Sequence, residues 1–164
     1  MKIFLLRHAK AQPGFPDSDR QLEPEGREHA AKLGAFLKNN RRFVPENLWS
    51  SPLARAQETA AIFAQAWGGS ISSPNEIEQL EPEIDPAPLI EMLSFARHDT
   101  LIVGHNPNLE TLASLLISGE RARSRVRLKT CCMICLQWNP LPNFGNFGPC
   151  ELLWMLDPRV IQPS

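Results

Sequence analysis

The sequence predicts an α/β protein, built as a three-layer α/β/α sandwich with a mostly parallel central sheet. Short apolar runs alternate along the chain with longer segments whose apolar residues recur at helical spacing, which indicates strands that alternate with helices. Most of the 15 prolines fall where these elements should begin or end. Parallel strands joined by helices bury both faces of a sheet, so we expect a helix layer on each side.

The N-terminal quarter predicts one strand, one loop and one helix. Residues 2–6 are apolar and partly β-branched, which is typical of a buried strand, and residues 10–22 are rich in proline, glycine and polar groups, as in a loop. A helix should follow Pro24 and end at Asn39-Asn40. Its buried stripe is expected at Ala30, Leu33, Gly34 and Leu37, which are spaced as neighbours on one helix face.

The next quarter predicts a second strand and a second helix. Residues 47–50 should form the strand, after which Ser51 is expected as the N-cap and Pro52 as the first helical residue. Gly68-Gly69 should end this helix. Its buried stripe is expected at Ala56, Thr59, Ala60, Phe63 and Trp67. The acidic, proline-punctuated segment that follows, up to residue 88, is interpreted as a connection.

The remaining half predicts two helices and three strands. Leu89, Met92, Leu93 and Ala96 mark one helix, and Leu109, Leu112, Ala113 and Leu116 mark another. Asn106-Pro107 repeats the cap-then-proline signal before the second of these helices. We expect strands at 100–103, 130–138 and 151–156, the last two joined by the Pro/Gly/Asn-rich segment 139–149.

Length and composition bound the class of protein. The 164 residues suit a single domain over 1–164, and 43% hydrophobic residues with 21% charged residues exclude wholesale disorder. The formal net charge of -1 gives no overall field toward nucleic acid or a membrane surface, so we expect neither as a partner. The apolar run at the N-terminus is too short for a signal peptide or a membrane span, which predicts a cytoplasmic protein.

Four cysteines lie in the last quarter of the chain: Cys131, Cys132, Cys135 and Cys150. Three of them fall in an apolar, strand-like run, so we expect reduced, buried thiols, as in a reducing compartment. Cys132-x-x-Cys135 has the spacing of a zinc ribbon but lacks a second pair, which favours the buried strand. The sequence therefore predicts neither a metal nor another cofactor.

Three predicted strands each end at a polar segment that leads into a loop or a helix. Arg7-His8 follows the first strand, Ser51 to Arg55 follows the second, and His105 follows the strand at 100–103. Carboxyl ends of strands border the ligand crevice of open α/β sheets, and helix N-termini there favour anions. Alone, each histidine could be structural or a cap, and Arg55 could be an exposed helical arginine. Together they predict a phosphate site.

These segments resemble the motifs of the histidine phosphatase superfamily, the phosphoglycerate-mutase-like enzymes. Leu-Leu-Arg-His-Ala-Lys-Ala at 5–11 resembles the first motif, in which Arg-His-Gly or Arg-His-Ala follows the first strand. Ser-Pro-Leu-Ala-Arg-Ala-Gln-Glu-Thr-Ala at 51–60 resembles the second, and Val-Gly-His-Asn at 103–106 the third. Within the family, the short chain and the His-Ala form are most similar to the small SixA-type phosphohistidine phosphatases. The resemblance spans residues 2 to about 118.

The resemblance implies a role for each matched residue. His8 would be the nucleophile that takes the phosphoryl group, and Arg7, Arg55 and His105 would bind its oxygens. Chemistry agrees, because a neutral imidazole nitrogen can attack phosphorus while fixed cations meet the charge on the equatorial oxygens, without a metal. Arg20 matches an arginine that the family places after the first motif, so it is predicted at the mouth of the site, or else it is a solvated loop residue.

A leaving-group acid is the least defined part of the predicted site. Relatives that act on alkyl phosphates carry a carboxylic acid after the second motif, and Glu81 occupies roughly that region. The alternatives are Glu76, Glu78, Glu83 and Asp85 in the same segment, Asp17 or Asp19 in the first loop, or a merely solvated acidic connection. A phosphohistidine substrate relaxes the need for an acid, because imidazole leaves phosphorus more easily than an alkoxide.

The short chain bears on the substrate. About forty residues separate the second motif from the third, which leaves little for a lid, and an open site suits a phosphorylated side chain presented on another protein. We therefore expect an enzyme that hydrolyses phosphohistidine on a protein partner. The alternatives are a mutase or phosphatase that acts on sugar or nucleotide phosphates, and a phosphate-binding module without catalysis.

Cations recur at every second position from Arg121 to Lys129, namely at Arg121, Arg123, Arg125, Arg127 and Lys129. In an extended chain this spacing places them on one face. The functional interpretation is a patch that steers an acidic phosphoprotein or, less favoured, nucleic acid. The alternative, which the pattern favours, is a charged edge strand or loop that resists aggregation.

Overall fold

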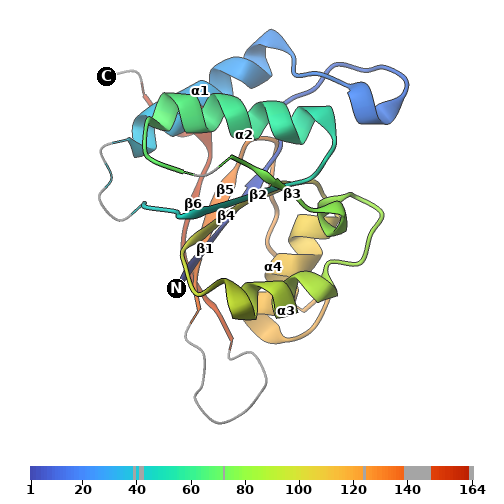
Figure 1. Cartoon of the computed structure of the whole chain (residues 1–164), viewed down its shortest axis with the longest axis vertical. Helices are drawn as coiled ribbons and strands as arrows, with labels where there is room; N and C mark the ends of the chain where they lie inside the picture. The colour runs from blue at the N-terminus through green and yellow to red at the C-terminus, as the bar shows by residue number, and fades with distance from the viewer. Residues whose placement is uncertain (39, 41–42, 72, 124, 139–148, 163–164) are drawn as a thin grey trace.

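A six-stranded sheet forms the centre of the protein (Figure 1). The computed structural model describes residues 1–38, 40, 43–71, 73–123, 125–138 and 149–162. Four strands are parallel: β1 (Lys2–Arg7), β2 (Asn47–Ser50), β3 (Asn75–Glu76) and β4 (Thr100–Gly104). On the other side of β1, β5 (Met133–Gln137) pairs antiparallel with β1, and β6 (Glu151–Leu156) pairs antiparallel with β5. The order across the sheet is β3-β2-β4-β1-β5-β6.

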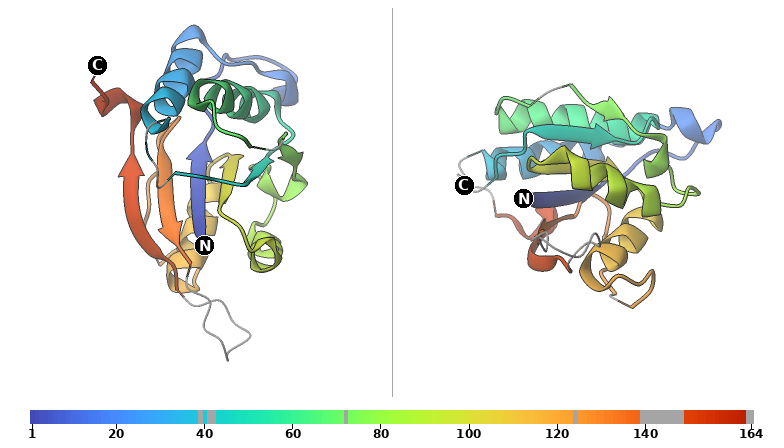
Figure 2. Two further views of the ribbon diagram at one scale, coloured as in Figure 1. Left: turned by 60° about the vertical axis from the view of Figure 1, so that its left-hand side comes forward. Right: turned by 60° about the horizontal axis from the view of Figure 1, so that its bottom comes forward.

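Helices cover both faces of this sheet (Figures 1 and 2). On one face lie α1 (Pro24–Leu37) and α2 (Ala54–Trp67), and on the other lie α3 (Ala87–Ala96) and α4 (Asn108–Ser118). Short 3-10 turns, η1 (Asp17–Asp19), η2 (Glu78–Leu80) and η3 (Pro158–Val160), complete the described structure. The predicted three-layer α/β architecture is confirmed.

Strand β1 shows why the N-terminal run is apolar at every position. Ile3 and Leu5 join the core beneath α3 and α4, whereas Phe4 and Leu6 join the core beneath α1 and α2. All four side chains have no exposed surface. Successive side chains of a strand point to opposite faces, so a strand with helices on both sides has no position left for a polar residue.

The helix stripes read from the sequence face the core. The five residues expected on the buried side of α2 are all buried, as are the four expected in α1. A Cβ on Gly34 would collide with the Phe63 carbonyl oxygen, so this glycine lets α1 and α2 approach closely. Gly68 ends α2 in the left-handed conformation, at φ 70°, as the sequence predicts.

Both predicted serine or asparagine N-caps are wrong. Helix α2 begins at Ala54, not at Pro52, and α4 begins at Asn108, after Pro107. Ser51 Oγ accepts the Leu53 N–H at 3.3 Å, while the Asn106 side chain donates to other partners. In both places the polar side chain makes tertiary hydrogen bonds, so the helix starts later.

The late segments differ from expectation in three places. Residues 130–132 form a turn rather than the start of β5, because Cys131 has a left-handed φ of 60°. The described residues of 121–129 form no strand, so the predicted charged segment is a loop. The connection after α2 contains the two-residue strand β3. The predicted linker 139–149 lies outside the described residues except for 149.

The four cysteines are buried as free thiols, as predicted. Burial, the largest cause, raises the pKa of Cys131 and of Cys135 to about 12. Over the described ranges, helices long and apolar enough to cross a bilayer are absent.

Candidate active site

The three predicted strand ends meet at one edge of the sheet. Arg7 at the end of β1 lies opposite Gly104 at the end of β4, and Ser50 of β2 lies opposite Val103. The His8 N–H donates to the Gly104 carbonyl at 2.9 Å, which carries the β1–β4 pairing past the strand ends. The residues that follow β1, β2 and β4 are therefore side by side, although more than ninety positions of the sequence separate His8 from His105.

His8 and His105 face each other across this edge. Their ring centroids are 4.8 Å apart, with the rings inclined at 48°. The backbone of His8 is held from the other side by the turn at Cys131, whose N–H contacts the carbonyls of both Arg7 and His8 at 3.1 Å. The left-handed conformation of Cys131 thus positions the first motif.

His8 is held as a neutral ring of defined tautomer. Its Nδ1 lies 2.7 Å from the Ala9 carbonyl oxygen, which can only accept, so Nδ1 carries the proton and Nε2 keeps its lone pair. Burial above all, and then the charges of Arg55 and Arg7, lowers the pKa of His8 to about 4. At neutral pH, Nε2 of His8 therefore carries a free lone pair, which is the form that nucleophilic attack by an imidazole requires.

His105 is more deeply enclosed, with 1% of its surface exposed. Its Nε2 lies 2.9 Å from Ser51 Oγ. Burial, followed by the nearby His8 and Arg55, lowers the pKa of His105 to about 2. Within the described residues its buried Nδ1 has no hydrogen-bond partner. His105 is thus a neutral ring with a polar atom left for a ligand.

Arg55 lies in the first turn of α2 and is 4% exposed. Its guanidinium donates to the Asp17 carbonyl at 2.8 Å and to Asp17 Oδ2 at 2.9 Å. Arg20 donates to the other carboxylate oxygen of Asp17 at 2.8 Å. Hydrogen bonding from Arg20, together with Arg55, lowers the pKa of Asp17. Two guanidinium groups therefore already share one carboxylate at this edge.

Arg7 completes the cationic side of the site. It donates to the Leu128 carbonyl at 2.9 Å, and burial lowers its pKa. Its buried Nε has no partner in the part of the chain that the structure describes. A buried guanidinium N–H without a partner is costly, so this atom is a further point at which an anion would be stabilised.

Thr59 and Ser51 support the site, and the sequence reading missed both roles. Thr59 Oγ1 accepts the Ala9 N–H at 3.0 Å and donates to the Arg55 carbonyl at 2.6 Å, so it joins the first motif to α2. The spacing predicts Thr59 only as part of the buried stripe of α2. The sequence does contain a signal for this role, because Thr59 places a hydroxyl on the buried face of α2 four residues after Arg55.

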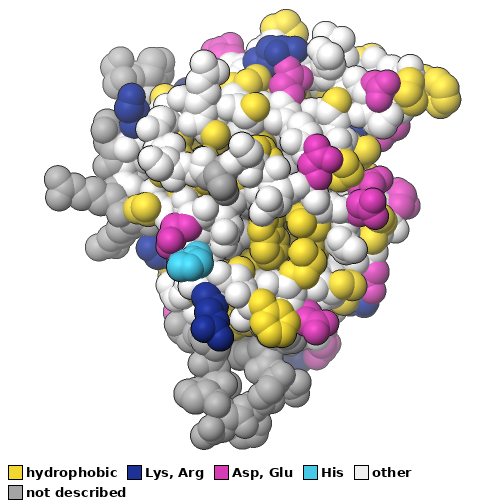
Figure 3. Space-filling view, in the orientation of Figure 1, with side chains coloured by type: hydrophobic (Ala, Val, Ile, Leu, Met, Phe, Trp, Pro, Cys, Tyr) yellow, Lys and Arg dark blue, Asp and Glu magenta, His cyan; other side chains and the backbone are white. Residues whose placement is uncertain are grey.

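The predicted acids are placed differently. Glu81 follows η2 on the half-exposed surface, and its side chain makes no hydrogen bond or ion pair with any described residue. Its neighbours Glu76, Glu78, Glu83 and Asp85 are exposed, and acidic side chains gather over this part of the molecule in Figure 3. Asp17, the alternative in the first loop, does reach the site, and it brings the predicted Arg20 with it.

The described residues contain no group of three or more His, Cys, Asp or Glu side chains that could hold a metal ion. The arrangement instead offers two arginines and two neutral imidazoles around one place. Guanidinium groups and N–H donors suit the spread charge of a tetrahedral anion, and Nε2 of His8 suits attack on its central atom.

Comparison with known proteins agrees with this geometry. The family model of the histidine phosphatase superfamily (branch 1) matches residues 3–82, which include His8 and Arg55. The sequence matches none of the curated proteins with which it was compared.

Three solved structures illustrate the similarity of fold. The protein histidine phosphatase SixA in complex with tungstate has a TM-score of 0.81 at 21% identity, covering 97% of this chain and 98% of its own. A protein assigned as SixA from Agrobacterium tumefaciens has a TM-score of 0.73 at 23% identity, covering 94% and 96%. A mycobacterial glucosyl-3-phosphoglycerate phosphatase with inorganic phosphate has a TM-score of 0.69 at 15% identity, covering 98% and 99%. The N-terminal part of the chain thus matches the family model of the histidine phosphatase superfamily, and the whole chain shares the fold of these solved structures.

Proposed function

We propose that the protein is a phosphatase that hydrolyses phosphohistidine on a protein substrate through a phosphorylated His8. The observation that carries this proposal is the fixed tautomer of His8, whose Nδ1–H is held by the Ala9 carbonyl at 2.7 Å. A neutral imidazole with a free Nε2 is not needed merely to bind phosphate, but it is needed to displace a leaving group from phosphorus.

The reaction has two displacements. First, the Nε2 lone pair of His8 forms a bond to phosphorus while the bond from phosphorus to the substrate imidazole breaks, and the substrate nitrogen leaves with the electron pair of that bond. The substrate imidazole leaves as a neutral ring when its other nitrogen already carries a proton, so this step needs no proton transfer. Second, a water oxygen forms a bond to phosphorus while the bond to Nε2 breaks and its electron pair returns to Nε2. Inorganic phosphate leaves with both protons of the water, and His8 is again neutral. Arg7, Arg55 and His105 would stabilise the charge on the equatorial oxygens in both steps.

The acid and base groups favour phosphohistidine over an alkyl phosphate. An alkoxide leaving group needs a proton donor, but the lowered pKa of Asp17 keeps this carboxyl ionised at neutral pH, and the Glu81 side chain makes no hydrogen bond or ion pair with a described site residue. An imidazole leaving group depends less on a proton donor in the site. Asp17 would then be a stand-in for substrate, since an incoming phosphoryl group competes with it for Arg55.

The shape of the site also supports a protein substrate. Between α2 and α3 the described chain contains only β3 and η2, so no large lid covers the edge where His8 and His105 lie. The alternative is a phosphatase for small sugar phosphates, which the shared fold of the glucosyl-3-phosphoglycerate phosphatase favours. We also propose a cytoplasmic location, on the basis of the four free, buried thiols.

A substrate panel tests the function. We expect turnover of a phosphohistidine peptide to exceed that of glucose 6-phosphate and other sugar phosphates under the same conditions. His8→Asn should abolish turnover, whereas His98→Asn, which changes an exposed histidine just before β4 and at the opposite end of that strand from His105, should leave it intact. Strong turnover of sugar phosphates without phosphohistidine hydrolysis would select the alternative, and ordinary rates in His8→Asn would refute the mechanism.

A further inference from the structure

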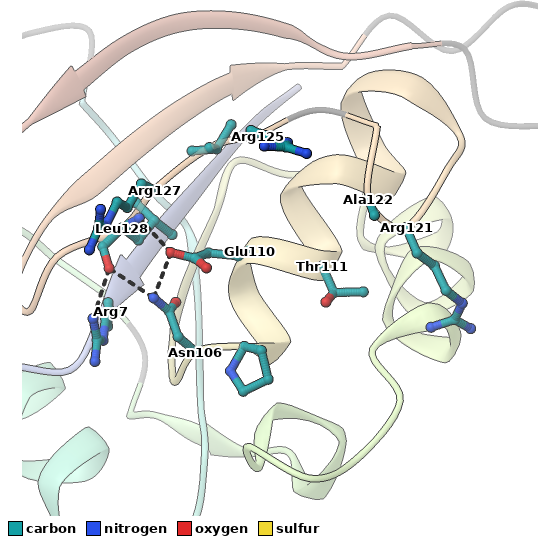
Figure 4. A pocket seen from close by; sticks show the side chains of 11 residues that line it. Arg7, Asn106, Glu110, Thr111, Arg121, Ala122, Arg125, Arg127 and Leu128 are labelled. Atoms are coloured by element: carbon teal, nitrogen blue, oxygen red, sulfur yellow. Dashed lines mark hydrogen bonds between the residues drawn. The ribbon is translucent and has the colours of Figure 1, made fainter.

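A cavity of about 610 Å³ opens next to the site (Figure 4). One wall is the start of α4, with Asn106 and Glu110, and the other is the loop at 121–128. Arg7 also lines it, so the cavity and the catalytic edge share a guanidinium group. Any molecule bound at His8 could therefore extend directly into this cavity.

The cavity is built by fixed hydrogen bonds rather than by loose surface chains. Glu110 Oε1 accepts the Leu128 N–H at 2.9 Å and the Asn106 amide at 2.7 Å. The Leu128 carbonyl accepts from Asn106 at 2.8 Å and from Arg7 at 2.9 Å. These bonds, drawn in Figure 4, tie the loop to α4 and to the end of β1.

The lining carries more positive than negative charge. Four arginines and one glutamate line the cavity: Arg7, Arg121, Arg125, Arg127 and Glu110. Arg121 is paired with Asp85 through contacts of 2.6 and 2.7 Å. Arg125 and Arg127 are exposed, and neither makes a hydrogen bond or ion pair within the described residues. Two cations are thus held beside the site without a partner of their own.

Protection of a sheet edge does not explain these two arginines. The described residues of this loop belong to no strand, and the edges of the sheet are β3 and β6. The aggregation-resistance interpretation allowed a loop as well as an edge strand, but it does not account for the position of Arg125 and Arg127 in the cavity wall. The arginines are better explained by what enters the cavity from the neighbouring site.

We propose that this cavity is a substrate subsite in which Arg125 and Arg127 bind acidic side chains that flank the phosphohistidine of the substrate protein. This inference rests on the proposed function, and it specifies the kind of polypeptide sequence that the enzyme prefers around the phosphohistidine. Arginine binds carboxylates through paired N–H donors, and a wide, open cavity accepts a polypeptide segment without enclosing it.

Carboxylates fit this subsite better than a second phosphate of a small molecule. A phosphate is held best where several donors converge on one point. Arg125 and Arg127 are two positions apart, so their Cα atoms are separated by at most about 7 Å in an extended chain. Their side chains are exposed, not gathered around one buried point. Such spacing suits two acidic residues along a polypeptide.

The test compares two phosphohistidine peptides that differ only in their flanks, Glu/Asp in one and Gln/Asn in the other. The preference for the acidic peptide is measured as the ratio of the kcat/KM values of the two peptides. In the double variant Arg125→Gln/Arg127→Gln, we expect this ratio to fall about fivefold to tenfold, because KM for the acidic peptide rises while kcat is unchanged. The matched control is Arg123→Gln/Lys129→Gln, which removes the same charge from the same loop but does not line the cavity. It should keep the preference.

A binding measurement separates the subsite from the proposed function. The unphosphorylated acidic peptide should bind to the native enzyme in calorimetry and bind more weakly to the double variant, whether or not phosphohistidine is turned over. An unchanged preference, or equal losses in the test and control variants, would overturn the subsite. So would a double variant that loses affinity for a small bisphosphate but not for the acidic peptide.

Discussion

The catalytic edge and the arginine-lined subsite lie side by side but are built in different ways. At the edge, His8 is half-buried and His105 is buried, and both rings are uncharged and fixed by backbone or side-chain contacts of 2.7 and 2.9 Å. In the subsite, Arg125 and Arg127 are charged and exposed, and their side chains make no hydrogen bond or ion pair with a described residue. Buried, preorganised groups serve a reaction, whereas exposed charges supply weak, screened attraction. Substrate choice can therefore change in the loop without disturbing the chemistry.

The largest effect is expected at Arg55, on the catalytic side. Arg55→Ala should cost on the order of 2 to 4 kcal/mol of transition-state stabilisation, because it removes a buried guanidinium aimed at the phosphoryl oxygens. The measurement is kcat/KM on the phosphohistidine peptide. Arg123→Ala, on the exposed surface, is the control. A loss of less than twofold would place Arg55 outside the reaction.

Protonation of His8 provides the next contrast. Because its pKa is lowered to about 4, the ring stays neutral as the pH falls from 7 to 5 and loses its nucleophilic lone pair only near pH 4. The unfolded chain, with an ordinary histidine pKa of about 6.5, binds the proton earlier, so the free energy of unfolding should decrease as pH falls between about 6.5 and 4. Nitrogen NMR of the imidazole ring measures the pKa of His8 in the folded and in the unfolded chain. Titration near 6.5 in the folded protein would refute the buried, neutral nucleophile.

A smaller change is expected when the internal carboxylate is removed. Asp17→Asn frees Arg55 and Arg20 for an external anion, so inhibition by inorganic phosphate should tighten by about threefold to tenfold. Asp19→Asn alters a neighbouring carboxylate that does not contact Arg55 and is the control. Should Asp17→Asn instead weaken phosphate inhibition and reduce turnover a hundredfold, Asp17 would be a proton donor and the argument for phosphohistidine would fail.

The smallest effect is expected from salt, to which the catalytic edge and the subsite should respond differently. Raising ionic strength from 0.1 to 1 M shortens the screening length from about 10 to about 3 Å, which weakens exposed charges far more than buried ones. We expect KM for the acidic peptide to rise severalfold while kcat changes little. If kcat and KM respond equally, the two regions are not electrostatically distinct.

Much of the site was accessible from sequence because its determinants are local. Strand ends in a parallel sheet share one edge, so Arg7, His8 and His105 could be placed together from the apolar runs that precede them. The apolar stripes of α1 and α2 follow from spacing alone. Relationships that depend on tertiary competition were not accessible, such as the Asp17–Arg55 pair or the hydroxyl of Thr59.

The wrong predictions share this cause. Ser51 and Asn106 have the residue type and position of N-caps. In the structure, however, Ser51 makes a hydrogen bond with His105 and Asn106 donates to Glu110, so neither side chain caps a helix. The cations at 121–129 alternate mostly with apolar residues, of which Leu128 is buried and Val126 packs against the core, but the described residues form a loop, one of the two forms that the pattern allowed. Strand β3 has two residues, which is too short for any periodicity to reveal.

The most direct test is rapid quenching of the enzyme during turnover, followed by mapping of the phosphorylated residue by mass spectrometry. A phosphoryl group that is stable in base, labile in acid and located on His8 is the predicted result. Label on any other residue, or a pre-steady-state burst with no phosphorylated protein, would contradict the nucleophile on which the proposed reaction depends.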